Sequence, residues 1–212
     1  MIARRSVRYG IVAMVLSLAG VTLAGKGTID AGSMKVTIYK FAVSATKDCT
    51  NPVVVFSSTA GVENDLLANP TYGSGPVDPG TYECVMIEMS KIIKTSAATT
   101  SGTCTQGVEF SDVICGTGQN AQLIDGTSVQ CTGDVGNPQH VTLYITTASA
   151  GQGGNRALLP PSSATDTTSG LKLTAPLVVT ANMPVTLNVD PKQFLEGSGP
   201  VCSTSAPSFG VN

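Results

Sequence analysis

The chain has 212 residues, of which only 12% are charged, and its formal net charge at pH 7 is −2. This length allows one large or two small domains. Low charge together with abundant Gly, Ser and Thr is typical of β-strands and turns rather than of a helical cytosolic enzyme. No basic patch follows the first eight residues, so nothing in the sequence supports nucleic-acid binding.

Residues 1–24 have the pattern of a secretory signal peptide. Three arginines (Arg4, Arg5 and Arg8) precede an uncharged apolar run of 15 residues, 10–24, which ends in small residues suited to cleavage. The run is short for a transmembrane helix, so an uncleaved membrane anchor is the less favoured alternative. Without the three arginines the chain keeps 9 basic against 14 acidic residues, a net charge of about −5. We therefore expect an exported protein of the periplasm, cell surface or extracellular space that does not bind membranes after cleavage.

All six cysteines follow this segment, which indicates disulfides. Their spacing does not select one pairing among the many that six cysteines allow. A metal site has little support, because no Cys-x-x-Cys occurs and the only histidine, His140, has no nearby ligand in the sequence. We expect no metal and no cofactor. The cysteines are Cys49, Cys84, Cys104, Cys115, Cys131 and Cys202.

The first part of the expected domain is read as a leader and two strands. Residues 25–33 are small and polar and predict a flexible leader. Residues 34–44 are apolar on both parities, which predicts a strand buried on two faces or a bulge near Lys40. A turn ending at Pro52 then leads into a short strand at 53–56.

The longest alternating segment follows and is expected to lie at the centre of an antiparallel sheet. It runs from Pro76 to Ile93, after a connection at 60–70 whose leucines are expected to close one end of the core. Val85, Ile87 and Met89 share one parity and predict one buried face. The opposite face carries Tyr82, Cys84, Met86, Glu88 and Ser90.

Residues 95–137 hold three of the six cysteines in a Ser-, Thr- and Gly-rich stretch, which predicts a disulfide-stapled insertion rather than a second domain. Short strands are expected at 108–110 and 122–124. Asp125-Gly126 is typical of a hairpin turn leading into 128–131.

The remaining segments complete an all-β pattern. Residues 140–148 predict a half-buried strand with Val141, Leu143 and Ile145 inward. Gly- and Pro-rich residues at 149–170 predict a mobile surface loop. Further strands are expected at 171–173, 177–180 and 185–190, followed by a Gly-, Ser- and Pro-rich tail at 195–212. Short strands without an amphipathic helix predict one antiparallel β-sandwich domain over 34–194.

Two motifs carry a resemblance to a known family. They are Pro79-Gly80-Thr81-Tyr82 before the central strand and the late pair 171–173 and 183–190 (Leu-Lys-Leu and Met-Pro-Val-Thr-Leu-Asn-Val-Asp). Together they resemble the transthyretin-like, carboxypeptidase-regulatory-like domains of exported bacterial envelope proteins. The resemblance covers 34–94 and 139–192 but not the cysteine-rich insertion. It implies a Greek-key β-sandwich without catalytic residues, serving adhesion, surface display or carbohydrate contact.

The residues themselves offer little catalytic chemistry. A nucleophile–His–acid arrangement would have to use His140, for which the spacing names no orienting carboxylate or nucleophile. Four acidic residues of the insertion could gather around calcium but lack the spacing of a calcium loop, so we expect solvated acids. Tyr72 and Tyr144 could stack on a sugar, although ordinary sheet packing is the favoured interpretation. The four acids are Glu109, Asp112, Asp125 and Asp134.

We therefore predict an exported, non-catalytic structural or adhesion-type binding module of the bacterial envelope or surface. Its contacts are expected on the insertion and the 149–170 loop, with a surface protein or a carbohydrate as partner. One alternative is self-association, as a filament subunit whose leader and first strand insert into a neighbouring copy. The second alternative, a secreted hydrolase, lacks an evident nucleophile and base.

Overall fold

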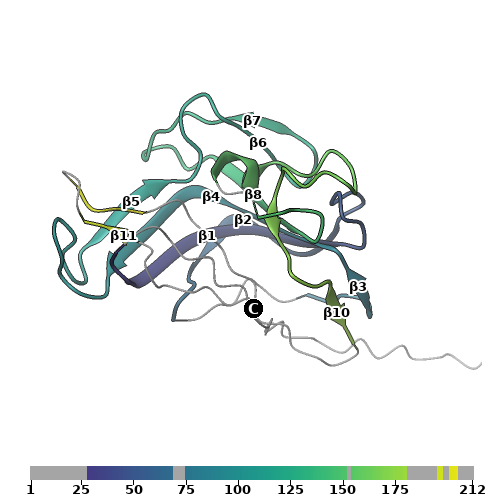
Figure 1. Cartoon of the computed structure of the whole chain (residues 1–212), viewed down its shortest axis with the longest axis horizontal. Helices are drawn as coiled ribbons and strands as arrows, with labels where there is room; N and C mark the ends of the chain where they lie inside the picture. Colours follow the sequence, from purple (N-terminus) through teal and green to yellow (C-terminus); the bar gives the residue numbers. More distant parts are fainter. Residues whose placement is uncertain (1–27, 69–74, 152–153, 181–194, 198–200, 205–212) are drawn as a thin grey trace, which may run out of the picture.

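The computed structural model describes residues 28–68, 75–151, 154–180, 195–197 and 201–204, which form an all-β fold with one short 3-10 helix (Figure 1). The expected signal peptide, the turn at 181–184 and the strand at 185–190 lie outside these residues. The strands are β1 (Ala31–Ser44), β2 (Val53–Asp65), β3 (Gly80–Tyr82), β4 (Cys84–Ala97), β5 (Glu109–Val113), β6 (Asn120–Gln122), β7 (Ser128–Gln130), β8 (His140–Thr146), β9 (Leu171–Lys172), β10 (Leu177–Val179), β11 (Leu195–Glu196) and β12 (Ser203–Thr204), and the helix is η1 (Gly154–Leu158).

One six-stranded sheet organises the fold, with the order β2-β1-β4-β8-β9 and β5 paired to β4. All its pairings are antiparallel except the two-residue contact between β8 and β9. β4 pairs with β8 as far as Ser90 and with β5 from Ile92 onward, so it touches three strands. The sequence correctly predicts this strand as the centre of an antiparallel sheet. A Greek-key connection stays a prediction.

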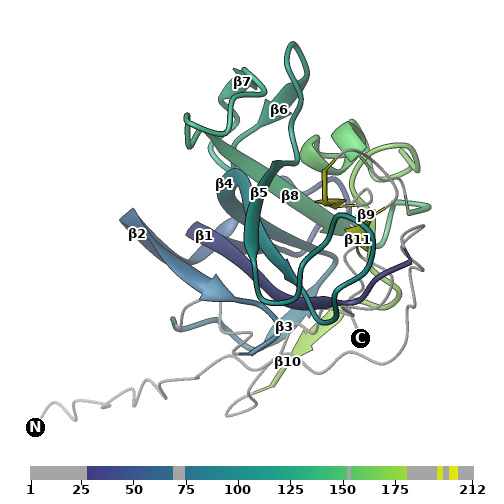
Figure 2. The ribbon, with the colours of Figure 1, turned by 90° about the vertical axis from the view of Figure 1, so that its left-hand side faces the viewer.

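The predicted long strand is interrupted at Glu83. Its backbone N–H donates to the Ser44 carbonyl (2.9 Å) and its carbonyl accepts from the Thr147 N–H (3.0 Å). The preceding residues, β3, leave the large sheet and pair with β10 instead. Figures 1 and 2 show this β3–β10 pair and the β6–β7 hairpin on opposite sides of the large sheet.

Both faces of the large sheet are covered. Val85, Ile87 and Met89 of β4 belong to the larger core, together with the inward residues of β8, as the alternation predicts. Met86 and Tyr144 lie in a smaller cluster on the opposite face with Ala42, Cys49, Cys84 and Ile124. The half-buried pattern expected for β8 is therefore wrong, because the β6–β7 turn covers its other face. The Tyr144 hydroxyl donates to the Leu123 carbonyl at 3.1 Å, and burial raises the pKa of this tyrosine.

A bulge in β1 confirms the irregularity expected near Lys40. Ile38 pairs with Met89 and Lys40 pairs with Glu88, which leaves Tyr39 as an extra residue on β1. The extra residue breaks the alternation, so Tyr39 and Lys40 both approach the face that carries Glu88. Phe41 then returns to the larger core opposite Ile87.

Other expected boundaries are corrected. β1 begins at Ala31, and Ile29 is buried and exchanges backbone hydrogen bonds with Leu195, so residues 28–33 are not a flexible leader. The tail likewise begins in the core, because Leu195 is fully buried.

β2 extends to Asp65, so residues 60–65 are strand rather than connection, while Leu66 is buried as expected. The 149–170 segment is not simply a surface loop, because η1 inserts Ala157 and Leu158 into the larger core. In the described ranges, no helix has the length and apolar character needed to span a membrane.

Candidate functional site

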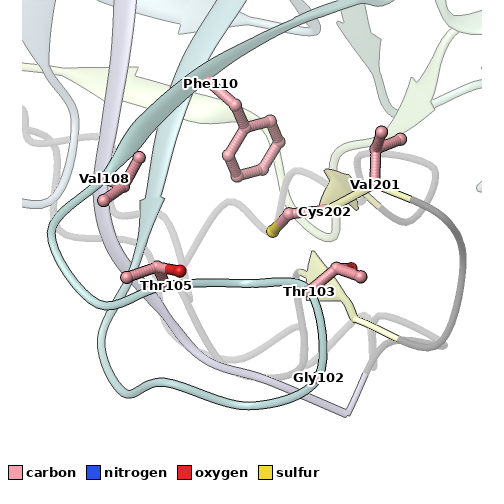
Figure 3. Close-up of a pocket in the computed structure, with 7 residues that line it drawn as sticks. All are labelled: Gly102, Thr103, Thr105, Val108, Phe110, Val201 and Cys202. Carbon is pink, nitrogen blue, oxygen red and sulfur yellow. The ribbon is translucent and has the colours of Figure 1, made fainter.

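A hollow of about 500 Å³ lies where the cysteine-rich insertion meets the C-terminal segment (Figure 3). It is framed by the loop before β5, the first half of β5 and the residues entering β12. None of its lining residues carries a charge. They are Gly102, Thr103, Thr105, Val108, Phe110, Val201 and Cys202.

The hollow is held together by one covalent and several polar contacts. Cys104 forms a disulfide with Cys202, which joins the insertion to the tail. The Thr103 N–H donates to the Gly197 carbonyl at 3.0 Å. Asp112 of β5 accepts two hydrogen bonds from Thr204, from its N–H at 2.9 Å and its hydroxyl at 2.6 Å. The two walls are therefore fixed before any ligand arrives.

Glycine is required at the base of the hollow. Gly102 has a φ of 58°, and a Cβ at this position would lie 2.1 Å from the Gly197 carbonyl oxygen. A larger residue would push the insertion away from the tail.

The hollow can bind apolar groups but has no acid–base chemistry of its own. Val108 and Val201 are 57% and 66% exposed, which is high for large apolar residues. Phe110 is partly buried against the core and presents its ring to the same space (Figure 3). The Thr103 hydroxyl already donates to Gly197. An apolar side chain placed here would bury all three hydrophobic groups.

A second group of side chains lies on the face of the sheet beneath the β6–β7 hairpin. The buried Glu88 carboxylate accepts from the Lys40 ammonium at 3.1 Å on each oxygen, and one oxygen is 3.3 Å from His140 Nδ1. The His140 ring stacks on Tyr39 with centroids 3.6 Å apart. The structure thus supplies an orienting carboxylate for His140, contrary to the expectation of a simple exposed sheet histidine.

This cluster does not amount to a hydrolytic site. Among the described residues, Glu88 is the only hydrogen-bond partner of the His140 side chain, so no nucleophile contacts the ring. Glu88 is itself engaged by Lys40 through both carboxylate oxygens. The arrangement fixes three strands side by side and explains a buried carboxylate without invoking catalysis.

A buried lysine, which the sequence does not reveal, anchors the insertion on the sheet. Lys91 is fully buried in β4, where its ammonium donates to the Thr132 hydroxyl (2.6 Å) and to Gln139 Oε1 (3.0 Å). The same Gln139 oxygen accepts from the Thr132 N–H at 2.9 Å. The only sequence signal is that Lys91 continues the parity of Val85, Ile87 and Met89, which predicts the buried face.

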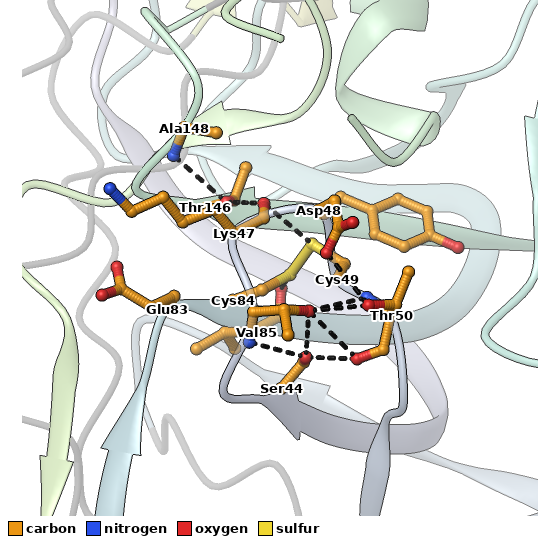
Figure 4. Close-up of a disulfide and its surroundings, with 12 residues drawn as sticks. Ser44, Lys47, Asp48, Cys49, Thr50, Glu83, Cys84, Val85, Thr146 and Ala148 are labelled. Atoms are coloured by element: carbon orange, nitrogen blue, oxygen red, sulfur yellow. Dashed lines mark hydrogen bonds between the residues drawn. A yellow bond between two sulfur atoms is a disulfide. The ribbon is translucent and has the colours of Figure 1, made fainter. Parts of the chain in front are cut away.

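All six cysteines are paired, as expected. Cys49–Cys84 closes the turn between β1 and β2 onto the start of β4 (Figure 4), and Cys115–Cys131 closes the β6–β7 region. The turn is further ordered around Asp48, whose pKa is lowered chiefly by hydrogen bonding to the Thr46 side chain. Two disulfides thus involve the insertion, and one of them ties it to the tail.

The four insertion acids do not converge. Glu109 pairs with Lys35 at 2.6 Å, and Asp112 accepts from Thr204. Asp125 and Asp134 each accept a backbone N–H two residues ahead, from Thr127 and Gly136. In the part of the chain that the structure describes, no three His, Cys, Asp or Glu residues are placed to hold a metal ion.

The tyrosine expectations have different outcomes. Tyr144 is buried in sheet packing, which confirms the favoured interpretation and removes it as a stacking surface. Tyr72 lies outside the described residues.

The comparisons with known proteins add no relative to this picture. No family model, no curated protein and no solved structure matches the chain.

Proposed function

We propose that this protein is an exported, non-catalytic binding module of the bacterial envelope or surface, and that the hollow between insertion and tail is its contact site. The observation that carries the proposal is a fixed, uncharged hollow with two highly exposed valines beside a phenylalanine ring. Exposed apolar groups around a prearranged hollow are typical of protein contact sites. The three disulfides support an oxidising compartment.

The chemistry of the lining favours an apolar side chain of a surface protein over an ionic ligand. A charged group would lose its hydration without gaining an opposite charge in this uncharged hollow. A carbohydrate would need several free hydroxyl or amide partners, whereas the Thr103 hydroxyl is already used.

A pair of matched variants tests the assignment. Val108 and Val178 are both 57% exposed, but Val178 lies on β10, outside the hollow. The oxidised protein would be screened against immobilised matrix proteins and a glycan array, with Val108→Asp and Val178→Asp in parallel. We expect capture by a protein component that Val108→Asp abolishes and Val178→Asp preserves. Equal loss in both variants, or capture only by glycans, would contradict the proposed site.

Self-association is the second candidate, and one observation favours it. β2 lies at the end of the large sheet among the described strands, its exposed residues include Val53, Val54 and Val62, and residues 53–62 carry no charge. Edge strands of this kind pair with other chains unless lysine or proline blocks them. β1 pairs with both β2 and β4 of its own chain, so this candidate rests on the edge of β2 rather than on donation of β1.

Light scattering after size-exclusion chromatography tests this second candidate. If β2 pairs between copies, the mass rises with concentration and Val62→Lys restores the monomer. A monomer at every concentration would remove the filament alternative in this form.

A further inference from the structure

The six cysteines differ sharply in their access to solvent. Five of them are buried, whereas Cys202 is partly exposed and lines the hollow. Figure 3 shows its sulfur directed into the space between Val108, Phe110 and the threonines. Its partner Cys104 is completely buried. Only the Cys104–Cys202 disulfide therefore presents a sulfur to an incoming molecule in the folded protein.

We propose that the hollow is a thiol–disulfide exchange site at which an external thiol, in its thiolate form, attacks Sγ of Cys202. A thiolate can exchange only with a sulfur that it can reach. A bond forms between the attacking sulfur and Cys202 Sγ as the Cys104–Cys202 bond breaks, and Cys104 leaves as a thiolate that takes a proton from water. The co-reactant is a monothiol, and the product is a mixed disulfide on Cys202. This exchange does not depend on whether the hollow also binds a protein partner.

The surroundings suit both the attack and the leaving group. The lining carries no carboxylate, so no nearby negative charge among these residues repels a thiolate. Cys104 Sγ lies 3.6 Å from the Glu196 carbonyl oxygen, which can accept a hydrogen bond from the thiol once it is protonated. An uncharged or apolar thiol compound, or a cysteine flanked by apolar residues, fits this lining best.

Other contacts hold the C-terminal segment in place in the mixed-disulfide form, in which the Cys104–Cys202 bond is broken. After the bond breaks, Thr204 still donates twice to Asp112, and Leu195 still pairs with Ile29. The C-terminal segment then remains attached by hydrogen bonds and by the burial of Leu195 in the core. Exchange thus replaces the covalent connection between the insertion and the tail by a noncovalent one.

The test is exchange of the native, oxidised full chain with 2-mercaptoethanol, followed by alkylation with iodoacetamide in denaturant, so that the buried Cys104 thiol is also reached, and peptide mass mapping. We expect the mixed disulfide on Cys202 and the alkyl group on Cys104. The other two disulfides should exchange at rates at least about tenfold lower, because their buried sulfurs react only from locally opened states. Reduction of all three at one rate, earlier reaction at another pair, or a mixed disulfide on Cys104 would each overturn the proposal.

Charge variants at the rim separate direct attack from local unfolding. Val108→Lys should accelerate the exchange and Val108→Asp should slow it, each by about threefold at low salt. Val178→Lys and Val178→Asp, at equal exposure outside the hollow, should leave the rate unchanged. Equal rates for the two Val108 variants would refute attack within the hollow. Because the readout is chemical, it stands whether or not a protein partner is found.

Discussion

Replacing Lys40 by methionine should destabilise the protein far more than the same replacement at Lys94. Lys40 donates to both oxygens of Glu88, whose side chain is 2% exposed, whereas the Lys40 side chain is 31% exposed. Removing one partner of a buried ion pair costs about 3–5 kcal/mol, because the remaining charge cannot reach water. His140 still contacts Glu88 and Lys40 is partly solvated, so we expect a loss of about 2–3 kcal/mol in the free energy of unfolding.

The Lys94 variant is the matched control. Its ammonium lies only 2.6 Å from Glu63, but the two side chains are 41% and 44% exposed. Exposed pairs contribute less than about 1 kcal/mol, so the shorter contact should matter less. Urea unfolding of both variants with the disulfides intact measures the difference. A loss at Lys94 equal to or larger than the loss at Lys40 would refute the reasoning that burial, rather than distance, decides the contribution.

Three further changes have defined outcomes. Gly61→Ala should cost more than about 1 kcal/mol in urea unfolding, because φ is 73° and the new Cβ would lie 2.7 Å from the Tyr39 ring; normal stability would show that β2 shifts freely. The double change Cys115→Ser and Cys131→Ser, at a sequence separation of 16, should cost about 3 kcal/mol, and an unchanged melting temperature would contradict this. Hydrogen bonding to the Asp166 carboxylate, chiefly from a backbone N–H, lowers its pKa, so Asp166→Asn should destabilise above about pH 4 and progressively less as the pH falls; a pH-independent difference in thermal melting would argue against this linkage.

The alternation of apolar residues predicts much of the sheet but not what covers it. The two faces of β4 are read correctly from Val85 and Met86, because alternation is a local property of an extended chain. The burial of Tyr144 depends on a hairpin turn more than 20 residues earlier, and no local pattern encodes that contact. The small residues before Met34 suggest a free leader, yet Ile29 is buried because Leu195 pairs with it.

The candidate site is almost entirely a product of long-range pairing. The sequence indicates that Cys104 and Cys202 form disulfides but cannot select each as the partner of the other, so the hollow between them is not predictable. Glu88 and His140 lie 52 residues apart and meet only through the register of β4 and β8. That the contact surface lies on the insertion is expected from the general tendency of exposed loops on a rigid sheet to carry binding surfaces, and it stays a prediction. The envelope-family resemblance stays a prediction.

The positions of two disulfides determine how the chain would transmit a mechanical load. They follow one another in the sequence without nesting, with separations of 35 for Cys49–Cys84 and 98 for Cys104–Cys202. Tension between residues 28 and 204 would pass through both sulfur bridges and bypass the enclosed segments. Only the residues before Cys49, those from Cys84 to Cys104 and the last few beyond Cys202 could be drawn out. The two central strands of the large sheet, β1 and β4, therefore lie in the segments that bear the tension, whereas β2, β5, β8 and β9 lie inside the bridged segments and are shielded under oxidising conditions. Breaking the Cys104–Cys202 bond would add the longest hidden length to the tether.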